Sequence, residues 1–410
     1  MDLRGARATY GAWWMALACF VLAGATGALF RLALVYGLVP DLSPVNLRHA
    51  HSHLMYFGWA TPALMALLAA SMPAVAGRPG MPGVRRVLAV VFVTALLAYP
   101  LFLLYGYTPA VLGARRLPLS VMAAGLNVLG WYAFVVCYVR ATRGVRRGRA
   151  LRLWDLALGF MVLATCGAWG LALMKPLGVE DPVWAAALTH FFLDLFSEGW
   201  FVLAVLGLAY AAAREEGTRL GDAGRWLIAA GLPLTFVFGM PPDRVPAGLV
   251  TPARLGAVLV AVGLLVNVGV LGRRLRGWSW RVPLGLLGLK AAGQLTLAFG
   301  PVGWWAASHG LRILYLHTML LGFVTLGLVA AARHVWGEDA VPAHRGLYAA
   351  VLALLATLLP LSRLWPGAWA GTWAAHGAAW GALLPVAAAT AMLWAVRRRR
   401  HPAARPVPES

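Results

Sequence analysis

The sequence predicts an all-α polytopic membrane protein whose helices form one bundle. Of its 410 residues, 61% are hydrophobic and only 12% are charged, whereas a soluble domain carries roughly a quarter of charged residues. The mean hydropathy is +0.74. Apolar runs of about 20 residues, the length that crosses a bilayer, recur along the chain with only short loops between them.

These runs predict about twelve transmembrane helices in one domain over residues 1–400. The seventh run is short and ends at Met240-Pro-Pro-Asp243, which leaves its ends the hardest to place. Residues 401–410 are rich in proline, and we expect them to form a disordered cytoplasmic tail. The predicted spans cover residues 11–37, 50–74, 85–107, 117–139, 153–174, 183–212, 226–240, 255–271, 282–300, 305–332, 346–364 and 370–396.

The positive charge of the chain sets its orientation. The net charge is +21, and arginines crowd every second loop, as in 140–152, 273–281 and 397–400, while the loops between carry few. This asymmetry places both termini in the cytoplasm of a cell whose cytoplasmic (inner) membrane holds the protein. The arginines then meet anionic membrane lipid, and we expect no nucleic-acid partner.

Histidines gather in one layer of the predicted bundle. Ionisable side chains inside a membrane are costly, so each is a candidate for function. Seven of the ten histidines fall on helices that run inward from the outer face, and within the outer half of the bilayer. This convergence favours a shared cofactor over a proton path across the membrane. The seven are His49, His51, His53, His190, His309, His317 and His376.

The second span opens with Arg48-His-Ala-His-Ser-His-Leu-Met55. His51 and Met55 are four residues apart and share a helix face. A neutral imidazole inside a helical bundle is a good axial ligand for haem iron. Arg48 can pair with a haem propionate or anchor the helix end, and His49 and His53 can equally be solvated at the head-group level.

The sixth span carries His190, Asp194 and Glu198, which follow i, i+4, i+8 and line one helix face. Two carboxylates and an imidazole in an apolar helix indicate a non-haem metal site, a proton relay, or both. The alternative is a structural ion pair with Lys290 of the ninth span, which has Gln294 one turn further on.

The tenth span contains His309, Arg312 and His317. His317 is deep and flanked by apolar residues, which makes it the most ligand-like histidine of the chain. Arg312 lies within a turn of His309, where it can neutralise a propionate or a carboxylate. His376 stands among alanine and glycine, which favours a hydrogen bond between helices.

The combined pattern resembles subunit I of the heme-copper oxidases, and most closely their nitric oxide reductase branch. That family has twelve spans and binds haem through the second, sixth, seventh and tenth. Arg48 to Leu54 is similar to the reductase run Arg-x-x-His-Thr-Asn-Leu, which implies that His51 binds the low-spin haem. The sixth-span residues His190, Asp194 and Glu198 take the places of a histidine and two glutamates, and His309 and His317 match the first two histidines of the tenth helix.

The chain also departs from that family. The third histidine position of the tenth helix is Met319, so a haem held by His51 takes either Met319 or His317 as its second ligand. Residues 232–241 lack the adjacent histidine pair that completes the family's second metal site. No tyrosine stands four residues after His190, so the cross-linked pair of the oxidases is impossible.

The resemblance implies a haem-binding membrane protein of respiratory electron transfer or of O2 and NO chemistry. It implies one or two b-type haems, with His51, His317, Met319, Arg48 and Arg312 around them. A degenerate second site would hold non-haem iron or copper through His190, Asp194 and Glu198, the two carboxylates being the catalytic candidates. The redox partner would be a c-type cytochrome or a quinol.

Two other functions fit the same residues. The first is a haem protein without catalysis, which serves electron transfer, sensing or haem handling. The second is a proton-coupled transporter that uses Asp194, Glu198, Lys290 and Arg312 without haem.

Overall fold

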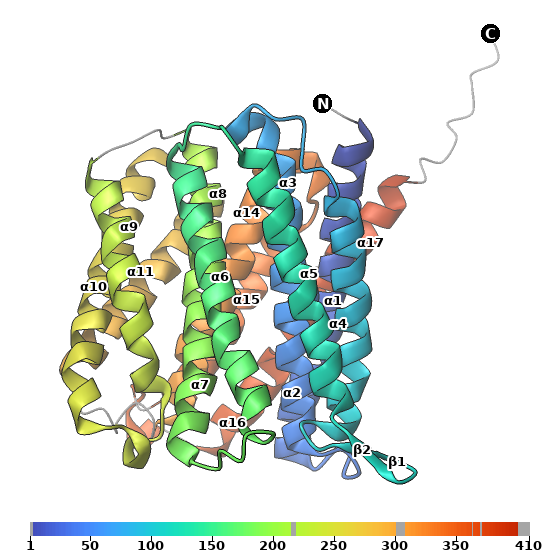
Figure 1. Ribbon diagram of the computed structural model, residues 1–410, viewed down its shortest axis with the longest axis vertical. Coiled ribbons are helices and arrows are strands. Elements are labelled where there is room, and N and C mark those ends of the chain that lie inside the picture. The colour runs from blue at the N-terminus through green and yellow to red at the C-terminus, as the bar shows by residue number, and fades with distance from the viewer. Residues whose placement is uncertain (1–2, 215–218, 301–307, 363, 370, 401–410) are drawn as a thin grey trace.

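The structure, a computed structural model, describes residues 3–214, 219–300, 308–362, 364–369 and 371–400. The proline-rich tail 401–410 lies outside these residues, so its disorder stays a prediction, as does the assignment of residues 1–400 to one domain. Almost all of the described chain is helical, and the helices pack side by side in one bundle (Figure 1). Their α-helical parts are α1 (Leu3–Tyr36), α2 (Pro44–Leu54), α3 (Thr61–Ala76), α4 (Val84–Tyr105), α5 (Leu119–Thr142), α6 (Arg149–Met174), α7 (Pro182–Asp194), α8 (Leu203–Ala213), α9 (Arg219–Gly231), α10 (Ala247–Arg274), α11 (Trp278–Phe299), α13 (His309–His317), α14 (Leu326–Trp336), α15 (His344–Leu358), α16 (Thr372–Gly381) and α17 (Leu383–Arg400).

The two ends of the bundle differ. One carries a short antiparallel hairpin of β1 (Ala110–Leu112) and β2 (Arg115–Leu117), and we name it the hairpin end. Its two-residue turn starts at Gly113, whose φ of +61° favours glycine. At the opposite end α1 begins and α17 ends (Figure 1). Both termini therefore lie at the same end of the bundle, as the predicted topology requires. That topology also predicts that the hairpin end faces outside.

Eleven helices among the described residues are long and apolar enough to cross a membrane. They coincide with the predicted spans except the seventh, where α9 has only 13 residues. The chain continues there as a tighter 3-10 helix, Leu232–Gly239, because Pro233 cannot donate to an α-helical ladder. Large apolar side chains such as Val93 and Leu104 stay exposed on the outside of the bundle, as a lipid-facing surface requires.

Two of the helices that carry candidate residues begin with an N-cap residue followed by a proline in the first helical position. Asp181 accepts a hydrogen bond from the backbone N–H of Val183 at 2.8 Å, and Pro182 opens α7. Ser43 and Pro44 open α2 in the same way. Both pairs are typical of helix starts. The predicted start of the second span at residue 50 was therefore wrong, because α2 begins six residues earlier.

Three spans change from α-helix to π-helix near the middle of their length. The wider turns are Met55–Ala60 between α2 and α3, Leu195–Val202 between α7 and α8, and Thr318–Thr325 between α13 and α14. These are the second, sixth and tenth spans, in which the sequence places the candidate residues. Since π-helical turns are rare and concentrate at functional sites, they mark the centre of the bundle as a site.

Candidate functional site

A cavity of about 930 Å³ lies between these three spans and α1. Its walls are mostly apolar, but histidines and charged residues line it from several helices. It brings together all of the predicted site residues: Arg48, His51, His190, Asp194, Glu198, Arg312, His317 and Met319. A large apolar cavity with a few convergent polar groups is the usual form of a ligand site.

His51 projects from α2 with its ring held by α1. Its Nδ1 lies 2.7 Å from the backbone oxygen of Ala23. Gly27 makes room for the ring, since a Cβ at that position would lie 2.5 Å from Nδ1. With Nδ1–H donating to a carbonyl, Nε2 carries a free lone pair toward the cavity, as in a metal-ligating histidine.

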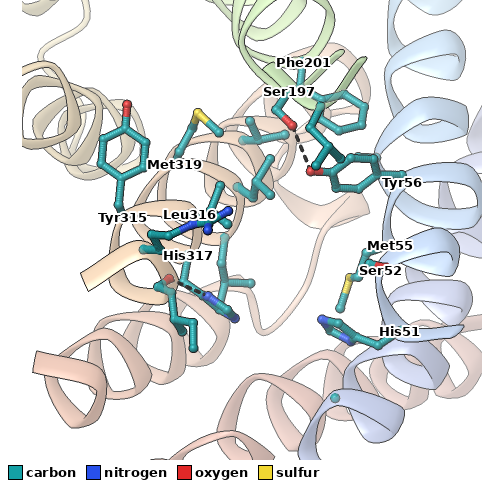
Figure 2. A pocket seen from close by; sticks show the side chains of 18 of the residues that line it. His51, Ser52, Met55, Tyr56, Ser197, Phe201, Tyr315, Leu316, His317 and Met319 are labelled. Carbon is teal, nitrogen blue, oxygen red and sulfur yellow. Dashed lines mark hydrogen bonds between the residues drawn. The ribbon is translucent and has the colours of Figure 1, made fainter. Parts of the chain in front are cut away.

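His317, the last residue of α13, is oriented in the same manner. Its Nδ1 lies 2.8 Å from the backbone oxygen of Ile313. Figure 2 shows the rings of His51 and His317 pointing toward each other across open space, from opposite walls of the cavity. The sulfur of Met319 lies away from this gap (Figure 2). Of the two candidate partners of His51, the geometry therefore favours His317.

Three arginines line the same cavity. Arg48 and Arg312 come from the first halves of α2 and α13, and Arg31 comes from the last turns of α1. Within the described parts of the chain, none of the three forms an ion pair with a carboxylate. Arg31 was missed by the sequence analysis. The sequence feature that could have identified Arg31 is its position inside the first predicted span, where an arginine is costly without a partner.

The other histidines of the layer have different surroundings. His53 is hydrogen-bonded to the His49 carbonyl at 2.8 Å and to the Tyr107 hydroxyl at 3.2 Å, and its ring stacks on Phe102. Its two nitrogens are thus already engaged. The exposed His376 makes the predicted hydrogen bond between helices, to the Tyr36 hydroxyl at 2.8 Å.

Glu198 forms an ion pair with a buried lysine. Lys290 Nζ, which is fully buried, lies 2.6 Å from Glu198 Oε1 and donates to Gln294 Oε1 at 2.6 Å. The Tyr315 hydroxyl donates to the same Glu198 oxygen at 3.3 Å. This is the structural ion pair that the sequence left open as the alternative.

The second metal site is not supported by this arrangement. Among the residues that the structure describes, no three histidine, cysteine or acidic side chains are grouped so that they could hold a metal ion. His190 packs closely against Gly239, where the Cβ of any other residue would collide with the imidazole ring. Asp194 lines the cavity and is half-buried.

Comparison with known proteins identifies the architecture. No family model matches the chain, and no curated protein is similar to it in sequence. Among solved structures, the chain is similar to a heme-copper terminal oxidase dimer determined by cryo-EM, with a TM-score of 0.64 and 14% identity. The match covers 99% of this chain and 86% of that one. The chain thus has the fold of a heme-copper terminal oxidase.

Proposed function

We propose that the protein binds one b-type haem between His51 and His317 and serves respiratory electron transfer. The observation that carries this proposal is the pair of imidazole rings that face each other across the cavity (Figure 2). Two histidines from different helices are the ligand set of low-spin haem in helical bundles. The shared fold with a heme-copper terminal oxidase supports it.

The donor set of the cavity fits such a group. Each ring has one nitrogen on a backbone carbonyl, which leaves the other free for iron. Arg31, Arg48 and Arg312 supply positive charge toward the hairpin end for two propionates. When bound, the haem would supply one-electron transfer. His51 and His317 would hold it, the arginines would neutralise its carboxylates, and apolar side chains would surround it.

A catalytic role in O2 or NO chemistry receives less support from the same geometry. His317 faces His51, so its imidazole would be used by the low-spin haem and would not be free for a high-spin haem. Glu198 is paired with Lys290. We therefore propose an electron-transfer protein of the cytoplasmic membrane, with both termini in the cytoplasm and a quinol or a c-type cytochrome as its redox partner.

A reduced-minus-oxidised optical spectrum of the purified protein tests this function. We expect the bands of low-spin haem b, unchanged by carbon monoxide, because protein imidazoles would fill both axial positions. A carbon monoxide shift would reveal an open axial position and would favour the catalytic role. The absence of any Soret band would leave the transporter hypothesis.

A further inference from the structure

The cavity contains a region that the proposed haem ligands do not use. It lies between α7, the 3-10 helix Leu232–Gly239, α10 and α11. We name it the acidic arm and define it by six residues that line the cavity. These are Asp194, Glu198, Phe238, Ala257, Gln294 and Leu297.

Two acceptors in the acidic arm lack a donor. Glu198 is 8% exposed, and its Oε1 is satisfied by Lys290 and Tyr315, whereas its Oε2 is buried without a hydrogen-bond partner. Asp194 makes no hydrogen bond or ion pair with any other described residue. A buried acceptor without a donor is costly, so Glu198 Oε2 is placed to receive a hydrogen bond from a ligand. The half-buried Asp194 carboxylate lines the same arm and can accept a second one.

The surroundings of these carboxylates define the kind of ligand. Phe238 and Ala257 are 8% and 1% exposed and belong to an apolar cluster that borders the arm. A bare cation is disfavoured because the Lys290 ammonium already supplies the positive charge at Glu198. The arm therefore fits a flat apolar ring with hydroxyl donors.

We propose that the acidic arm binds the head group of a membrane hydroquinone, whose hydroxyls donate to Asp194 and to Glu198 Oε2. This inference rests on the proposed haem function, since the haem would be the electron acceptor. Oxidation to the quinone releases two electrons and two protons. The two electrons would reduce the ferric haems of two protein molecules, one electron for each, and the two protons would leave through the Asp194 carboxylate to water.

The first test is anaerobic reduction of the purified haem protein by a short-chain hydroquinone. We expect one hydroquinone to reduce two haems. Asp194→Asn should slow the reaction at least about tenfold, the loss expected for one hydrogen bond to a charged group, with unchanged haem content and full reduction by dithionite. The matched control is Asp155→Asn, because Asp155 pairs with Arg147 and Tyr138 outside the cavity. Equal rates in both variants would overturn the proposal.

The second test detects binding without electron transfer. A photoreactive azidoquinone should label peptides of α7, α10 or α11, and unlabelled quinone should compete with it. Ala257→Phe, which fills the arm, should abolish the label while leaving the haem spectrum intact. Labelling confined to other helices would refute the site even if haem is bound. A protein without haem would refute the proposed function, while the labelling pattern would still decide whether the arm binds a quinone.

Discussion

His51→Ala and His317→Ala are each expected to remove the haem from the purified protein. Each substitution deletes one axial imidazole and leaves a cavity that water can enter. Since the two rings approach from opposite walls, neither can replace the other (Figure 2). The haem content per protein, measured as the pyridine haemochrome, should fall to a small fraction of the wild-type value in both variants.

Two control variants separate ligation from general damage. Met319→Leu keeps the volume of a buried side chain and should retain the haem. His376→Ala removes an exposed histidine that bonds Tyr36, and it should also retain the haem. Loss of haem in Met319→Leu with retention in His317→Ala would show that the methionine is the ligand.

Lys290→Met is expected to destabilise the protein by about 3–5 kcal/mol, the usual cost of breaking a buried ion pair from one side. The substitution leaves the buried Glu198 carboxylate without its counter-charge, and Gln294 loses its donor. Thermal unfolding in detergent, followed by circular dichroism, should show a clear fall of the Tm.

The chain offers a matched control for this variant, because its only other lysine is Lys175, which lies exposed in a loop. Lys175→Met should leave the Tm unchanged. The double variant Lys290→Met with Glu198→Gln should recover most of the loss, since it removes both charges. A Tm of Lys290→Met equal to that of Lys175→Met would contradict the role of the pair.

The sequence predicts the membrane fold well because span length and apolar composition depend on the bilayer more than on tertiary contacts. Eleven predicted spans are confirmed as membrane-length helices in the described chain. The seventh differs because a proline falls inside a short apolar run. The three π-helical segments cannot be read from periodicity, since they depend on how the spans pack against each other.

The sequence predicts which residues belong to the site, but it does not predict which of them contact each other. Periodicity identifies the helix faces that carry His51 and His317, and the predicted residues line one cavity. Periodicity cannot decide whether His317 or Met319 faces His51. The two residues point about 200° apart on an α-helix, but they flank the start of a π-helical turn, where that angle no longer holds. Periodicity also cannot reveal which spans are neighbours. Therefore the Lys290 pair remained one alternative among several, and nothing in the sequence placed Arg31 of the first span beside the histidines.

The most direct test of the central claim is near-infrared magnetic circular dichroism of the oxidised protein. The position of its charge-transfer band distinguishes two imidazole ligands from one imidazole and a thioether. We expect the band of bis-histidine ligation, from His51 and His317. A band typical of histidine and methionine, or a protein that binds no haem, would contradict the account.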